Sequence, residues 1–200
     1  MTQWVTPSGG RRRGPLGIAI AWVAVLTRPR EFFERSIAAG DQGPGLTFLV
    51  AVVLVAQGTR FALGVDTYPV VAERPLASAL FWLLVVAVLV APLALHVVAA
   101  LQTVLLAIGT AGEDRGGVSE TVQVLAYAAA PCVLAGVPVP ALQLAVGSLA
   151  AGLYVYGIAV VHDCSVPRAL VLGVVPAVAA YGYGFQTIGA LPAAGGVLGL

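Results

Sequence analysis

The chain has 200 residues, of which 60% are hydrophobic and 10% charged, with a formal net charge of +1. A soluble domain carries roughly a quarter charged residues, so this chain has too little polar surface to coat a water-soluble globule. We therefore expect an all-α, polytopic membrane helix bundle. The near-neutral charge also excludes the strongly basic surface that nucleic-acid binding requires.

Residues 1–43 are expected to form a cytoplasmic N-terminal segment that contains a short interfacial helix. Its apolar run, 16–26, would cover roughly 16 Å as a helix, about half of a hydrocarbon core near 30 Å. An interfacial or re-entrant helix therefore fits best. The alternatives are an uncleaved signal-like span and a cleaved signal, although no small-residue cleavage site follows.

Residues 44–190 are predicted to form a five-span transmembrane domain, followed by a C-terminal tail at 191–200. The expected spans are 44–65, 76–109, two within the uncharged run 121–161, and 167–189. The joint inside 121–161 should fall at Gly136–Pro140, because a residue before proline is pushed out of the helical region. The run 76–109 exceeds one bilayer crossing, so it either tilts and projects into the cytoplasm or breaks near Pro92.

Arginine placement predicts the orientation, since cytoplasmic loops are enriched in basic residues. Six of the ten basic residues precede the first span: Arg11, Arg12, Arg13, Arg28, Arg30 and Arg35. We expect a multi-pass protein of the cell membrane with a cytoplasmic N-terminus and an external C-terminus.

Polar residues inside spans are the candidates for function, because hydrocarbon offers them no partner. Gln57 and Arg60 share one helical face, where they could contact a substrate or a lipid headgroup; the favoured interpretation is that Arg60 extends to the interface while Gln57 bonds a neighbouring helix. His96 could relay protons, but a packed, hydrogen-bonded histidine near the inner surface is favoured. His162 and Asp163 close the fourth span.

Two further arrangements remain as alternatives. A zinc site could use His96, His162 and Cys164, whereas Cys132 lies too deep to join them; no metal or other cofactor is expected. In addition, Pro92, Pro131 and Pro176 each remove one backbone donor from a span. The three kinked helices either line a cavity or simply shape the bundle.

Several of these features, in this order and spacing, resemble the Yip family, the multi-pass proteins named for interaction with Ypt/Rab GTPases. The resemblance covers about residues 27–190. The positions that carry it are Pro29, Phe32 and Phe33 before the first span, Tyr127 and Pro131 in the third, and Pro176 in the last. It implies an all-helical five-span bundle with a cytoplasmic N-terminus and, in eukaryotic members, a role in membrane organisation or trafficking. The chain lacks the Asp-Leu-Tyr-Gly-Pro motif of eukaryotic members, so GTPase binding is not expected.

No Walker loop, Gly-x-Gly-x-x-Gly or Gly-x-Ser-x-Gly motif occurs, so an enzyme is not expected. The first hypothesis for function is a non-enzymatic scaffold or organiser whose partners are the lipid bilayer, other membrane proteins or a second copy of the chain. The alternative is a small transporter or channel that uses the proline-kinked spans. A metal-dependent membrane enzyme is the least favoured hypothesis.

Overall fold

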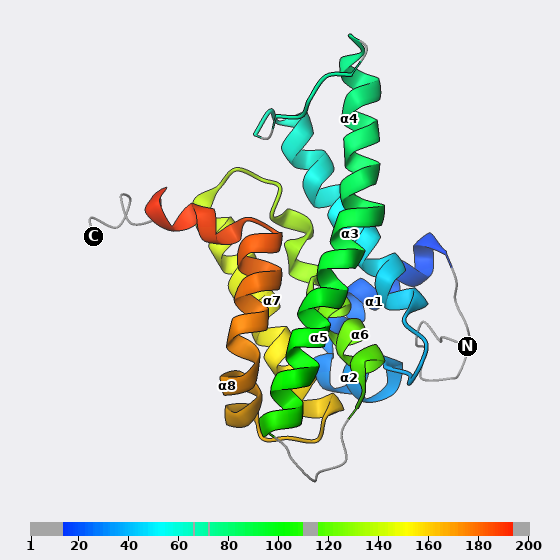
Figure 1. Cartoon of the computed structure of the whole chain (residues 1–200), viewed down its shortest axis with the longest axis vertical. Coiled ribbons are helices and arrows are strands. Elements are labelled where there is room, and N and C mark those ends of the chain that lie inside the picture. The colour runs from blue at the N-terminus through cyan, green and yellow to red at the C-terminus, as the bar shows by residue number, and fades with distance from the viewer. Residues whose placement is uncertain (1–13, 66, 72, 110–115, 194–200) are drawn as a thin grey trace.

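The computed structural model describes residues 14–65, 67–71, 73–109 and 116–193, and every regular element within them is a helix (Figure 1). The predicted all-α fold is therefore confirmed. The elements are α1 (Pro15–Thr27), α2 (Pro29–Ser36), α3 (Gly43–Ala62), α4 (Pro75–Leu84), η1 (Val85–Val90), α5 (Ala91–Gly109), α6 (Val118–Ala128), η2 (Ala130–Leu134), α7 (Pro140–Val161), α8 (Val166–Ala177), η3 (Val178–Gly184) and η4 (Thr187–Ala190).

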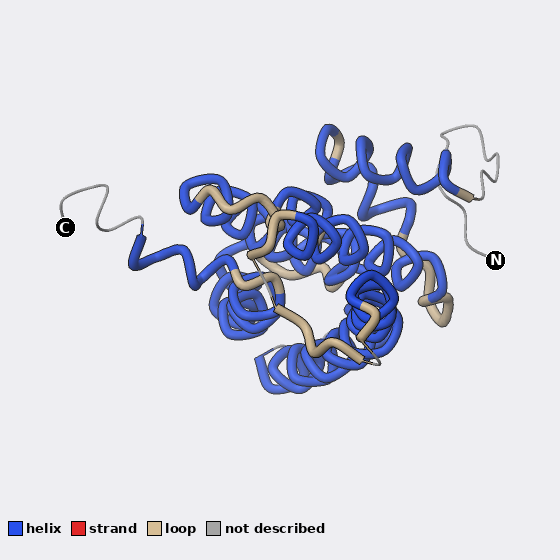
Figure 2. The backbone as a smooth tube through the Cα atoms, turned by 90° about the horizontal axis from the view of Figure 1, so that it is seen from above, coloured by secondary structure: helices blue, strands red, loops and turns tan. Residues whose placement is uncertain are grey.

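Four helices in the described residues are long and apolar enough to cross a membrane: Gly43–Ala62, Pro75–Gly109, Pro140–Val161 and Val166–Gly184. The fifth expected span corresponds to a shorter apolar segment, Val118–Leu134. It lies inside the bundle, in contact with α1, α3, α5 and α7, and Figure 2 shows from above that the described chain is a bundle of helices joined by loops.

The run expected at 76–109 is one continuous helix rather than two. Pro92 does not break it, because the preceding turn, η1, is a π-helix in which the Ala91 N–H bonds the Val86 carbonyl five residues earlier. This wider turn lets the helix continue although Pro92 has no backbone N–H to donate. The combined helix Pro75–Gly109 has 35 residues.

The other predicted boundaries agree with the observed helices to within a few residues, except at the end of the last span. The chain turns between η2 and α7, and α7 begins at Pro140 as the two closely spaced prolines indicate. Gly136 in this turn packs so closely on α3 that an added Cβ would collide with the Ala56 carbonyl. The last span ends at Gly184, earlier than residue 189, because Gln186 takes a left-handed conformation with φ of 58°.

The centre of the bundle is α6 with the start of η2. Residues 121–132 are all buried, and α6 contacts α1, α3, α5 and α7. In hydrocarbon, helix association depends on close packing rather than on apolar burial from water. Small residues provide that approach: Gly157 of α7 lies directly against Val124 of α6 and Phe33 of α2.

The α1 helix has 13 residues, or about 20 Å, too short to span a core near 30 Å. It packs on the side of α6 and η2, where the Trp22 indole donates a 2.8 Å hydrogen bond to the Ala130 carbonyl. After it, α2 buries Phe32 and Phe33 while Arg30–Glu34 and Arg35–Glu31 ion pairs lie on its exposed face. This two-sided pattern suits a helix at the membrane surface.

Two glycines of α7 provide a matched test of the close packing. Gly157→Ala would place a Cβ 2.7 Å from Val124 Cγ1 and 2.9 Å from Phe33 Cζ, so we expect a loss of about 1–3 kcal/mol of unfolding free energy. Gly152→Ala meets nothing within 4 Å and should be neutral or stabilising by up to about 1 kcal/mol. Unfolding titrations in mixed micelles measure both; equal stabilities would contradict this packing.

A second matched pair tests the attachment of α1. Trp22→Phe removes the donor to the partly buried Ala130 carbonyl, and we expect a cost of about 1 kcal/mol. Trp82→Phe removes an exposed indole bond to the Pro69 carbonyl, where water or headgroups can substitute, so it should cost less. The same unfolding titrations compare the two variants. A larger loss for Trp82→Phe would show that α1 is not held by this bond.

Candidate functional site

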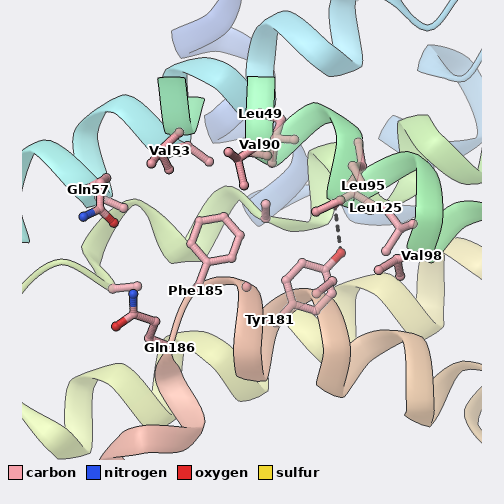
Figure 3. A pocket seen from close by; sticks show the side chains of 18 of the residues that line it. Leu49, Val53, Gln57, Val90, Leu95, Val98, Leu125, Tyr181, Phe185 and Gln186 are labelled. Carbon is pink, nitrogen blue, oxygen red and sulfur yellow. Dashed lines mark hydrogen bonds between the residues drawn. The ribbon is translucent and has the colours of Figure 1, made fainter. Parts of the chain in front are cut away.

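A cavity of about 160 Å³ lies between α3, the η1–α5 part of the long helix, η3 and the central helix α6. Its walls are almost entirely apolar, with Val53 of α3, Val90 of η1, Leu95 of α5 and Phe185 after η3 facing one another (Figure 3). Leu125 of α6 lies at the end where the Tyr181 hydroxyl donates a 2.9 Å hydrogen bond to its carbonyl. A cavity with such walls suits a hydrocarbon group.

Residues beside all three in-span prolines contribute to this cavity. Val90 and Ala91 precede Pro92, Ala129 precedes Pro131, and Ala179 and Ala180 follow Pro176. Two of these segments, η1 and η3, are π-helical. The proline-bearing helices therefore line a cavity, which was one of the two alternatives from sequence, in addition to shaping the bundle.

The polar end of the cavity holds Gln57, Arg60 and Gln186; Figure 3 shows Gln57 and Gln186 together at the end opposite Tyr181. The favoured expectation for Arg60 is wrong: its side chain does not extend outward but is only 8% exposed, and Nη2 donates a 2.7 Å hydrogen bond to Gln186 Oε1. Gln186 follows η3 in a left-handed backbone conformation, and its side-chain oxygen accepts the bond that holds the Arg60 side chain inward.

A second hollow, of about 600 Å³, adjoins the cavity at these two residues. Arg60 and Gln186 line both spaces, and Gln143 and Tyr183 add polar groups to the second. The Arg60–Gln186 pair therefore borders both an apolar cavity and a wider, more polar hollow. Gln186 was not singled out from the sequence; its signal is an amide that interrupts the apolar run of the last span.

His96 lies apart from this cavity. Its Nδ1 is 2.7 Å from the Pro92 carbonyl oxygen, and its Nε2 is 2.9 Å from Oε1 of Gln42, the residue immediately before α3. Both ring nitrogens are thus engaged at the level where α3 begins. This arrangement ties the long helix to the start of α3, and it matches the favoured expectation of a packed, hydrogen-bonded histidine.

His162 and Asp163 lie at the end of α7. His162 is buried, with Nε2 3.2 Å from the Thr121 hydroxyl, which donates to the Gly117 carbonyl at 3.1 Å. Asp163 is exposed and takes a left-handed conformation with φ of 46°. Both residues therefore help to turn the chain out of α7 beside the start of α6.

The alternative zinc site is not assembled. Within the described ranges, which include His96, His162, Cys132 and Cys164, no group of three His, Cys, Asp or Glu residues lies close enough to hold a metal ion. His96 is held by Gln42, and His162 packs against Thr121. The structure therefore offers this hypothesis no ligand set.

Four of the six motif positions that carry the family resemblance meet where α2 packs against α6. The rings of Phe32 and Tyr127 pack edge to face with centroids 4.9 Å apart, and Phe32 and Phe33 pack edge to face at 5.7 Å. Pro29 begins α2 and so sets the position of both phenylalanines. These positions build the junction between α2, α6 and α7.

The two remaining motif positions, Pro131 and Pro176, lie next to segments that line the cavity. Pro131 stands at the start of η2, where the α-helix of α6 has given way to a tighter 3₁₀ turn. Pro176 lies inside α8, directly before the π-helix η3. Both prolines are buried, and both change the helical winding next to the cavity lining.

Comparison with known proteins gives one family. The Yip1 domain model matches residues 23–187, which includes the end of α1, all of α2 and every span. No curated protein and no solved structure gives a significant match. The sequence resemblance is thus confirmed over most of the chain, and the bundle with its buried aromatic junction is the Yip1 domain of an integral membrane protein that belongs to the Yip family.

Proposed function

We propose that this protein has a non-enzymatic role as an organiser of other membrane proteins, and that its α4 helix provides the docking surface. The observation that carries this proposal is the length of the helix Pro75–Gly109. Its 35 residues extend about 52 Å, whereas a hydrocarbon core is about 30 Å thick.

Tilting alone does not place this helix within the core. A tilt of about 55° would be needed, beyond the range of roughly 0–40° seen in transmembrane helices. Figure 1 shows α4 extending past the level at which α7 begins. Within α4, only Ser78 is buried, while Leu76 is 74% exposed and Phe81 is 54% exposed. An apolar helix that leaves the core needs a protein partner to cover it.

The arrangement of arginines supports the expected orientation in the cell membrane. The α2 helix, with Arg28 just before it, Arg30 and Arg35, lies at the same end of the bundle as the start of α8, which carries Arg168 (Figure 1). Arg74 is at the opposite end, just before α4. The basic end is proposed to face the cytoplasm, which places the N-terminus inside, the C-terminus outside, and α4 toward the exterior.

The alternative of a small transporter has less support. Its natural route would be the cavity between α3, η1–α5 and η3, but that cavity is lined mainly by aliphatic and aromatic side chains. An ion or a polar solute would find few partners there. A metal-dependent enzyme would require a set of metal ligands, and the His, Cys, Asp and Glu side chains of the described residues do not gather into a group of three that could hold an ion.

Site-specific photo-crosslinking in native membranes tests the organising role. A photoreactive residue replaces Leu76 on α4 or, as the matched control, Val171 on α8, which is 75% exposed within a span. We expect discrete protein adducts from position 76 and lipid adducts from position 171, because position 76 lies on the part of the long helix proposed to leave the core, whereas position 171 lies within a span. A differently tagged second copy shows whether the captured protein is the same chain. Lipid adducts alone at both positions would overturn the proposal.

A further inference from the structure

We propose that the proline-flanked cavity binds the part of a hydrocarbon chain nearest the head of an anionic amphiphile, whose acidic head lies at Arg60. The ligand class is a carboxylate or phosphate attached to an alkyl chain, supplied either by a free fatty acid or by an acidic phospholipid. The site combines two features that meet at the Arg60–Gln186 pair: an apolar cavity and a more polar hollow, both lined by these two residues.

The size and lining of the cavity fit a short stretch of hydrocarbon. A comparable apolar cavity of about 150 Å³ stays dry and takes up benzene, so a volume of about 160 Å³ accommodates about six carbon atoms. Val53, Val90, Leu95 and Phe185 leave a water molecule few hydrogen-bond partners. An alkyl chain from the surrounding bilayer needs no hydrogen-bond partner and can occupy this space.

The shape of the surrounding helices keeps this space open. The π-helical turns η1 and η3 both line the cavity, and π turns inside α-helices frequently occur at functional sites. An empty space of this size forfeits the contacts that its lining atoms would make with an occupant. The turns are tied to Pro92 and Pro176, so the helices do not close the gap by relaxing to a regular winding.

The polar end selects for negative charge. The Arg60 guanidinium is buried among helices and donates to Gln186 at 2.7 Å, and Gln57 lies one turn earlier on the same side of α3. A guanidinium binds carboxylate and phosphate through a planar pair of donors. The hollow of about 600 Å³ beyond Arg60 has room for the rest of a headgroup.

Ligand binding to the full-length protein in phosphatidylcholine nanodiscs tests this inference. The probes are dodecanoic acid, dodecanol with the same chain and a neutral head, and dioctanoyl phosphatidylglycerol, each measured by native mass spectrometry at a pH where the acid is ionised. The variants are Arg60→Gln, which removes the charge, and Val53→Phe, which fills the cavity and leaves Arg60 in place. Arg74→Gln is the matched control, because it removes an exposed arginine near the same end of the bundle.

We expect the wild type to bind an acidic probe about tenfold more tightly than dodecanol, the effect of roughly one charge-assisted hydrogen bond. Arg60→Gln should lose this preference, Val53→Phe should lose binding of every probe, and Arg74→Gln should behave as wild type. If Arg60→Gln does not fold, the acid–alcohol preference of the wild type and the Val53→Phe result decide. No preference in the wild type, or unchanged binding in Val53→Phe, would overturn the proposal.

The two acidic probes distinguish the source of the ligand. Binding of dodecanoic acid without phosphatidylglycerol identifies a free fatty acid, and the reverse identifies a phospholipid; either result supports the site. If neither acidic probe binds, the proposed site is overturned. Because the crosslinking at Leu76 concerns α4 rather than this cavity, failure of one experiment does not imply failure of the other.

Discussion

A proline inside a membrane helix leaves the carbonyl four residues earlier without its usual donor, and hydrocarbon offers no replacement. This chain contains three such prolines, and its architecture follows from how each is accommodated. At Pro92 and Pro176 the helix winds into a neighbouring π turn and continues. At Pro131 the α-helix gives way to a 3₁₀ turn and the chain then reverses direction.

The backbone near Pro131 is completed by side chains from distant segments. Tyr181 of η3 donates to the Leu125 carbonyl, and Trp22 of α1 donates to the Ala130 carbonyl. These bonds connect α1 and η3 to the central segment on either side of Tyr127, whose carbonyl is the one that Pro131 leaves without its usual donor. The segment around Pro131 is therefore where α1 and η3 dock, and η3 in turn forms one wall of the cavity.

The sequence predicts the helical class, the joint before Pro140 and the approximate spans, because apolar runs and proline spacing are local signals. The local sequence does not show that Pro75–Gly109 is one continuous helix. The helix passes Pro92 through the π turn η1, and this turn packs against α3, which is distant in the sequence. Arg60 likewise cannot be placed from its own segment. Its side chain is held inward by Gln186, which lies 126 residues later in the sequence. Gln186 takes its left-handed backbone conformation just after η3 ends.

The two sides of the central helix consequently have different characters. On the α2 side, Phe32, Phe33 and Tyr127 pack edge to face, and Phe33 lies against Gly157, where an added Cβ has no room. On another side, Leu125 and Ala129 of the same central segment line the cavity, together with π-helical turns and the buried Arg60. The closely packed side supports the helix that forms one wall of the cavity, because the backbone of this helix is also bonded to α1 and η3. In this arrangement the aromatic family motif is the structural support, and the prolines of the same motif shape the cavity.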